Sequence, residues 1–146
     1  MNELRCFNCG CSFNGSRSNQ LFCSPKCRYK YNKNEYLILT LKKIWFDMIK
    51  EGVKLEEYRE IKPYWTKRFE NFFGCYYNTN EEKDIDGNIP EYIWSKQNKI
   101  IEFRNGYGNN VPKFLAECVI SEGYGRKEWG AEPKTKYYIL TIKRIL

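Results

Sequence analysis

The sequence predicts an α+β protein in which a small mixed β-barrel with inserted helices follows a small N-terminal finger. Three observations lead to this prediction. Paired cysteines and turn-forming residues fill the start of the chain, five later segments have the pattern of short strands, and two segments between them have the helical period. We therefore expect two units, a finger over residues 1–34 and a barrel over residues 36–146.

The finger is predicted from its turn formers and from a helix start. Residues 10–22 are rich in Gly, Ser and Asn, which favours a short hairpin between the two cysteine pairs. Ser24 and Pro25 have the pattern of an N-cap followed by proline at the first helical position. A helix over residues 25–32 would place Cys27 in its first turn, as in a treble-clef or zinc-ribbon finger.

The first half of the barrel alternates strands and helices. Residues 36–41 are mostly apolar and predict a buried strand, and residues 44–49 then carry apolar side chains at helical spacing. Residues 55–60 predict a second strand. The period of two in a strand places Glu57 and Arg59 on the same face of it.

A second helix and three strands complete the barrel. Pro63 starts the helix, and its aromatic stripe ends before Gly74. Residues 75–98 are less regular, and the charged run at 81–87 predicts a solvated loop. The remaining strands are predicted over residues 99–104, 114–120 and 137–145.

Four cysteines are spaced as the ligands of one metal ion, in the pattern C-x2-C-x13-C-x3-C. Thiolates bind Zn²⁺ tetrahedrally, and each cysteine pair supplies two of them from one tight turn. The chain has no histidine, so the site must be all-thiolate. Because four protein ligands close the coordination sphere, we predict one structural zinc ion, bound by Cys6, Cys9, Cys23 and Cys27.

The other three cysteines are not needed for this site. Cys11 would fit the first pair only with a distorted turn, and Cys75 and Cys118 stand alone in predicted apolar surroundings, as small core residues do. The odd total of seven cysteines and the paired spacing typical of metal ligands oppose a disulfide framework and predict a reducing, cytoplasmic setting. No stretch reaches the ~20 apolar residues that span a bilayer, and no apolar segment follows Met1, so we expect neither secretion nor a membrane partner.

Positive charge is concentrated near the start of the chain. The whole protein has a net charge of +7, and residues 1–35 hold six Lys or Arg against two Asp or Glu, a net of +4. This asymmetry predicts a polyanion partner near the junction of the two units. The alternative is a soluble basic protein without such a partner. Aromatic residues make up 17% of the chain, and they can stack on nucleobases or fill a barrel core.

The second motif is G-x-K-x-x-E-x-R, which runs from Gly52 to Arg59. Gly52 lets the chain leave the first barrel helix through a left-handed turn. We expect Lys54 to project from the rim where helix and strand meet, beside Glu57 and Arg59. Such a polar cluster is suited to gripping a nucleotide or to holding a catalytic lysine. Alternatively, Glu57 and Arg59 only close one end of the barrel.

This motif resembles the signature of the ASCH domain, a relative of the PUA RNA-binding barrel. Its flanks, residues 44–49 and 61–65, fit the resemblance, and residues 103–107 and 128–131 are similar to segments of small phage-type ASCH proteins. The resemblance covers residues 36–146 and implies a PUA-like fold with a cleft for RNA or a modified nucleoside. Carried over residue by residue, it implies these ligand-binding positions: Gly52, Lys54, Glu57, Arg59, Arg104 and Tyr107.

Some ASCH relatives are amidohydrolases acting on acylated cytidine, and some are ribonucleases. In the amidohydrolase type, the resemblance implies a lysine that activates a threonine nucleophile. Lys54 matches this lysine, but Glu57 occupies the position of the threonine. Three hypotheses follow. The preferred one is a nucleic-acid-binding module, for RNA by resemblance. The others are an enzyme on RNA or modified nucleosides with Lys54 and Glu57 as catalytic residues, and an adaptor whose finger binds a protein.

Overall fold

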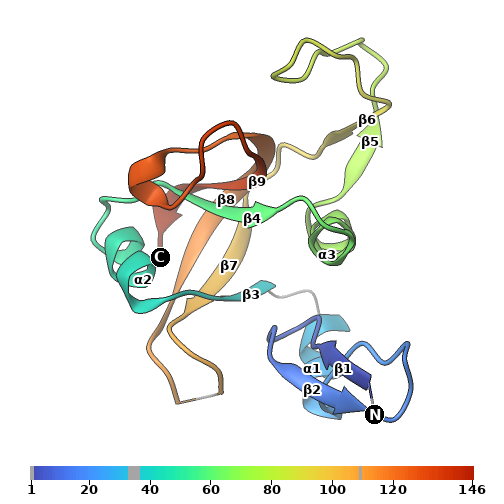
Figure 1. Cartoon of the computed structure of the whole chain (residues 1–146), viewed down its shortest axis with the longest axis vertical. Helices are drawn as coiled ribbons and strands as arrows, with labels where there is room; N and C mark the ends of the chain where they lie inside the picture. Colours follow the sequence, from blue (N-terminus) through green and yellow to red (C-terminus); the bar gives the residue numbers. More distant parts are fainter. Residues whose placement is uncertain (1, 33–36, 109) are drawn as a thin grey trace.

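In the computed structural model, which describes residues 2–32, 37–108 and 110–146, a curled mixed sheet packs against helices (Figure 1). This confirms the α+β class. The main sheet has the order β3-β7-β8-β9-β4, with β3 parallel to β7 and the other neighbours antiparallel. Its strands are β3 (Leu37–Thr40), β4 (Glu56–Glu60), β7 (Lys99–Arg104), β8 (Lys113–Tyr124) and β9 (Lys136–Ile145).

The five strands of the main sheet are the five that the sequence predicted for the barrel. The sheet curls into a half-barrel, and within the described residues its edge strands β3 and β4 do not pair with each other. Tyr36, the predicted start of the first strand, lies outside the described residues, as does the predicted boundary between residues 34 and 36. An edge position leaves one side of β3 free to face another part of the chain.

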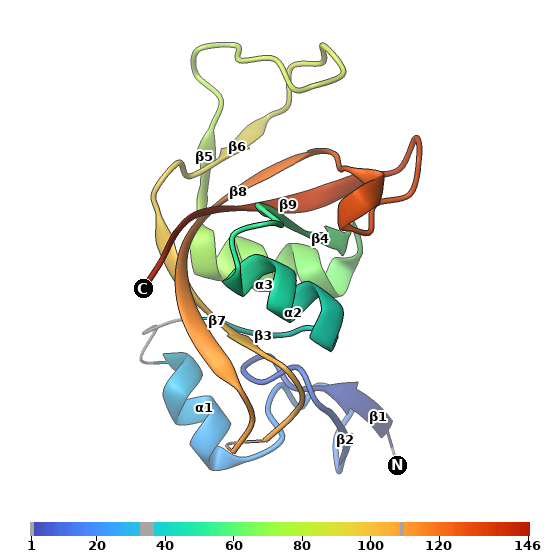
Figure 2. The ribbon, with the colours of Figure 1, turned by 90° about the vertical axis from the view of Figure 1, so that its left-hand side faces the viewer.

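Two helices lie within the curve of the sheet (Figure 2). They are α2 (Lys43–Lys50) and α3 (Pro63–Phe73), both close to their predicted bounds. Phe46 and Ile49 of α2 and Phe69 and Phe73 of α3 are buried in one core with the inward side chains of the strands. In the part of the chain that the structure describes, no helix is long and apolar enough to cross a membrane.

The irregular region between α3 and β7 contains a small hairpin that the sequence did not predict. Its strands β5 (Cys75–Tyr77) and β6 (Tyr92–Trp94) are antiparallel and carry the charged loop between them (Figure 1). Strands of three residues are too short to show a period. Cys75 is exposed, so its prediction as a core residue is wrong, because β5 lies outside the main sheet. Cys118 is buried as predicted, and burial raises the pKa of its thiol to about 12.

The N-terminal segment, defined here as residues 2–32, consists of a hairpin and a helix. Strands β1 (Asn2–Arg5) and β2 (Ser12–Gly15) enclose the first cysteine pair, so the prediction of a hairpin between the pairs is wrong. Backbone bonds from the Cys6 amide to the Cys11 carbonyl, and from the Gly10 amide to the Cys6 carbonyl, make this pair the hairpin turn. Helix α1 (Pro25–Asn32) is confirmed, with the Cys27 amide donating to the hydroxyl of Ser24 at 3.2 Å.

Candidate functional site

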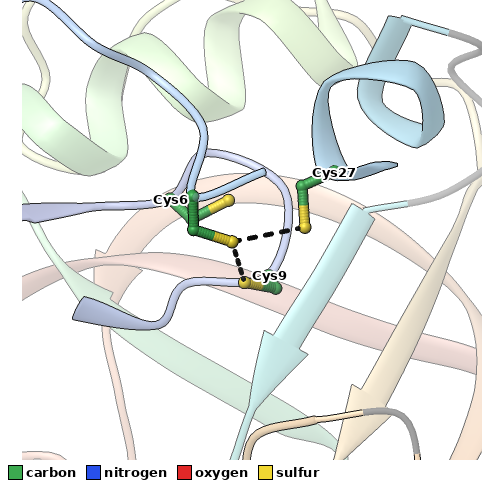
Figure 3. Close-up of side chains that lie close together, drawn as sticks. Cys6, Cys9 and Cys27 are labelled. Carbon is green, nitrogen blue, oxygen red and sulfur yellow. Dashed lines mark hydrogen bonds between the residues drawn. The ribbon is translucent and has the colours of Figure 1, made fainter. Parts of the chain in front are cut away.

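The four predicted ligand cysteines meet at one point of the N-terminal segment. Their Sγ atoms all lie within 4.8 Å of one another. Figure 3 shows Cys6, Cys9 and Cys27 gathered between the hairpin turn and the start of α1. Sulfur ligands about 2.3 Å from a tetrahedral ion are about 3.8 Å apart. The distances from Cys23 Sγ to Cys9 Sγ, 3.7 Å, and to Cys27 Sγ, 3.6 Å, fit that geometry, so the cluster can hold one metal ion.

The surroundings of this cluster favour a cation. The neighbouring Cys9 thiol and burial raise the pKa of Cys6 to about 12. The thiolate form of Cys6 is therefore favoured at neutral pH only beside a positive ion, such as a bound metal. Cys11, which the sequence pattern left out of the ligand set, lies next to the cluster, with its Sγ 3.0 Å from that of Cys9.

A pocket of about 450 Å³ lies where the N-terminal segment meets the edge of the main sheet. Residues from β1 and the hairpin turn after it, from β3, α2, β4 and α3, and from β9 and the turn before it line the pocket. Cations outnumber carboxylates in this lining, which gives the pocket a positive potential. The charged lining residues are Arg5, Lys42, Lys54, Arg59 and Arg68 with Glu57, Glu60 and Glu132, and the aromatic ones are Trp45, Tyr58, Trp65, Trp129 and Tyr137.

The three charged residues of the G-x-K-x-x-E-x-R motif form one ion-paired group in this pocket, which we call the motif triad: Lys54, Glu57 and Arg59. The Lys54 Nζ atom lies 2.8 Å from Glu57 Oε1, and Arg59 donates to Glu57 Oε2. Lys54 also donates to the Trp129 carbonyl at 2.6 Å and lies 4.5 Å from the ring centre of Trp45. Its side chain is only 1% exposed, so the expectation that Lys54 projects from the rim is wrong.

The charges of the triad support one another. Burial lowers the pKa of Lys54, although the Glu57 carboxylate opposes that shift. Burial acts to raise the pKa of Glu57, but the charges of Arg59 and Lys54 outweigh it and the pKa is lowered. Glu57 is therefore an ionised carboxylate with both oxygens bound by cations. This arrangement suits a structural brace and leaves no free oxygen to accept a proton.

The remaining predicted positions lie apart from the triad. Gly52 follows α2 with φ +81°, which confirms the left-handed turn, but it is not among the residues lining the pocket. Arg104 pairs with Glu102 and donates to the Gly108 carbonyl at 2.9 Å. Tyr107 is 54% exposed. Neither Arg104 nor Tyr107 is among the described residues around the pocket, so the structure does not bring them to the triad.

The sequence did not identify Arg68, which joins the pocket to the cysteine cluster. Its side chain is fully buried on α3. Nε donates to the Phe7 carbonyl at 2.6 Å, and Nη2 donates to the carbonyls of Asn8 at 3.0 Å and Ile38 at 2.6 Å. Phe7 and Asn8 separate the two cysteines of the first pair. The overlooked signal was a positive charge three residues after Trp65, on the apolar stripe of the helix.

Tyr64 makes a second connection between α3 and the N-terminal segment. Its hydroxyl donates to the Cys6 carbonyl at 3.2 Å, and its ring packs edge-on against Phe7 at 5.9 Å. The guanidinium of Arg5 lies 5.6 Å from the centre of the same ring. The first cysteine pair is therefore fixed against the helix that forms one wall of the pocket.

Comparison with family models, curated proteins and solved structures finds no match to this chain. The ASCH resemblance and its PUA-like fold stay predictions from the motif. The cysteine cluster and the pocket are therefore the features of the protein that indicate a function.

Proposed function

We propose that this protein binds nucleic acid, RNA by preference, in the pocket between the N-terminal segment and the main sheet. The observation that carries this proposal is the lining of the pocket, which combines five cations with five aromatic rings. Cations bind phosphates, and rings stack on bases for about 1–3 kcal/mol per base. The preference for RNA comes from the ASCH resemblance.

The dimensions of the pocket suit a single nucleotide. Small-ligand pockets have volumes of about 300–1,000 Å³, and this pocket has about 450 Å³. Trp45 and Trp65 are the two of its rings that are partly exposed, so they are the ones that a base can reach. The rest of a nucleic-acid strand would lie along the basic N-terminal segment.

We propose zinc as the metal of the cysteine cluster. Four cysteine sulfurs at tetrahedral spacing are a ligand set that Zn²⁺ prefers. The closed coordination sphere gives the ion a structural role. Its contribution here is to hold the hairpin turn that carries Arg5 and Gly10 of the pocket.

Binding is favoured over catalysis by the state of Glu57. A water-activating base needs an oxygen that can accept a proton, whereas Lys54 and Arg59 occupy both carboxylate oxygens of Glu57. The same contacts also hold the Lys54 ammonium in place. The geometry therefore supports a binding module better than an enzyme that uses these two residues.

We expect the affinity for single-stranded RNA to fall steeply with salt. Neutralising about three phosphates of a single strand predicts about a 20-fold loss between 50 mM and 200 mM salt. Fluorescence anisotropy with a labelled mixed-sequence oligonucleotide measures this. Absence of binding even at the lower salt concentration would contradict the proposal.

Replacing one of the reachable rings is expected to weaken RNA binding while leaving the fold intact. Trp45→Ala removes a partly exposed ring from the pocket and should cost about 1–3 kcal/mol of binding free energy. Tyr107→Ala removes an exposed ring outside the pocket and is the matched control. If Tyr107→Ala weakened binding and Trp45→Ala did not, the pocket would be the wrong site.

A further inference from the structure

Three guanidinium groups gather at the end of the pocket formed by the N-terminal segment. Arg59 and Arg68 lie 5.1 and 5.3 Å from the ring centre of Trp65. Arg5 and Arg68 lie 5.6 and 5.8 Å from the ring centre of Tyr64. The three side chains come from β1, β4 and α3, so the fold collects like charges from distant parts of the chain.

These charges are poorly balanced by the protein. Glu57 pairs with Arg59, but it also pairs with Lys54. Among residues 2–32, 37–108 and 110–146, no carboxylate forms an ion pair with Arg5 or Arg68. Arg5 is exposed, but the side chain of Arg68 is fully buried, and burying an unpaired charge costs several kcal/mol. Four thiolates around a divalent metal ion would carry net negative charge and would offset part of this electrostatic cost. They would not accept a hydrogen bond from the remaining N–H groups of Arg68.

Two buried polar atoms at this end of the pocket have no hydrogen-bond partner within the described structure. They are Arg68 Nη1 and Thr40 Oγ1, two of the three such side-chain atoms found. Thr40 and Arg68 both line the pocket. Gly10 also lines it, and a Cβ added to Gly10 would lie 3.9 Å from Arg68 Nη1, so no side chain covers this atom from that direction. Buried donors without partners are rare and indicate a missing acceptor.

We infer that this end of the pocket is a phosphate subsite, in which Arg5, Arg59, Arg68 and the hydroxyl of Thr40 hold the phosphate of one nucleotide. The base of that nucleotide stacks on Trp45, at the other end of the pocket. This inference rests on the proposed function and narrows its ligand to nucleotides that carry a phosphate. Guanidinium forks match phosphate geometry, and they bind it more strongly than neutral donors do. The phosphate comes from a free nucleotide or from an RNA strand, because both present the same oxygens.

The test compares ligands that differ only in the phosphate. The metal-loaded protein with all 146 residues is titrated with uridine, uridine 5′-monophosphate and inorganic phosphate, and its tryptophan fluorescence is followed. We expect the monophosphate to bind about 10- to 100-fold more tightly than uridine. Labelled RNA with a 5′-phosphate or a 5′-hydroxyl then identifies the source. Equal affinities indicate an internal phosphodiester, and a preference for the 5′-phosphate indicates a terminal group.

Two variants probe the subsite itself. Arg5→Gln removes an exposed guanidinium and is expected to reduce the preference for the monophosphate over uridine about tenfold. Arg17→Gln makes the same change of charge on the same segment, outside this pocket, and is the control. Thr40→Val removes a hydroxyl that has no hydrogen-bond partner among the described residues, so it should weaken monophosphate binding several-fold without lowering the melting temperature.

The outcomes separate the subsite from the proposed function. Equal binding of uridine and its monophosphate, or equal effects of Arg5→Gln and Arg17→Gln on monophosphate and RNA, would overturn the subsite while leaving nucleic-acid binding intact. Binding of inorganic phosphate that depends on Arg5, without binding of nucleotide or RNA, would support the subsite and overturn the proposed function. Selective loss of phosphate-bearing ligands in Arg5→Gln and Thr40→Val would support both.

Discussion

Chelation of the zinc ion proposed for the cysteine cluster is expected to unfold the N-terminal segment and to weaken ligand binding in the pocket at least tenfold. The two strands of this segment have four residues each and its helix has eight, too few to be stable without further support. A structural zinc ion contributes about 10–16 kcal/mol to the folding of such small units. Loss of helical and strand signal by circular dichroism, together with nucleotide titration before and after chelation, measures both effects.

Loss of the metal ion should change the shape of the pocket through Arg68. The carbonyls of Phe7 and Asn8, between the first two cysteines, accept two of its hydrogen bonds. When the hairpin turn loses its shape, those acceptors move and a buried guanidinium is left with fewer partners. Arg5 and Gly10, which line the pocket, should leave its wall at the same time. Because linkage is reciprocal, the pocket ligand should also raise the affinity for the metal.

Single cysteine variants supply the controls for this prediction. Cys27→Ser should abolish binding of one metal ion per chain, whereas Cys75→Ser, which changes an exposed thiol far along the sequence, should retain it. Cys11→Ser should also retain the metal, because Cys11 is not one of the four clustered ligands. Metal loss in Cys11→Ser would show that the ligand set is different. Unchanged nucleotide affinity after chelation would contradict the link through Arg68.

Most of the main sheet could be predicted because its segments are long enough to show a period. Residues 99–104 and 137–145 are apolar or alternating runs bounded by turn formers, and both became strands. The strands β5 and β6 have three residues each and show no such pattern. The hairpin of the N-terminal segment was predicted at the wrong place because residues 10–22 are rich in turn-forming residues. The turn of the observed hairpin instead contains the first cysteine pair, Cys6 and Cys9.

The candidate site likewise contains some contacts that the sequence could predict and others that it could not. Lys54, Glu57 and Arg59 are close in sequence, so a local motif could indicate that they lie together. Arg68 reaches the Phe7 carbonyl across 61 residues, and that contact depends on how the N-terminal segment docks on α3. Burial of Lys54 was also beyond the motif, because it depends on the distant Trp129 carbonyl. Contacts between remote segments are set by tertiary packing and leave no spacing pattern.

The second large effect is expected from Glu57→Gln. This change keeps the shape of the side chain but removes the negative charge between Lys54 and Arg59. Breaking a buried ion pair by neutralising one partner costs about 3–5 kcal/mol, since the other charge stays buried and uncompensated. Urea denaturation of the metal-loaded protein measures this loss as a lower transition midpoint with an unchanged slope.

The exposed pair of Glu60 and Lys62, 2.8 Å apart, provides the matched control. Glu60→Gln makes the same chemical change on the same strand and should cost less than about 1 kcal/mol. Because the pKa of Glu57 is lowered in the folded protein, its stabilisation is complete above the ordinary carboxyl pKa and fades as the pH falls through the lowered value. The stability difference between wild type and Glu57→Gln should therefore narrow on acidification.

A double variant distinguishes a brace from a binding group. Adding Lys54→Met to Glu57→Gln removes the buried cation as well, and stability should recover in part, because no uncompensated ammonium remains. If Lys54 and Glu57 act mainly as a brace, this double variant should keep most of its affinity for uridine 5′-monophosphate, because the residues of the proposed phosphate subsite, Arg5, Arg59, Arg68 and Thr40, are unchanged. Recovery of stability without recovery of binding would instead make Lys54 a direct contact of the ligand.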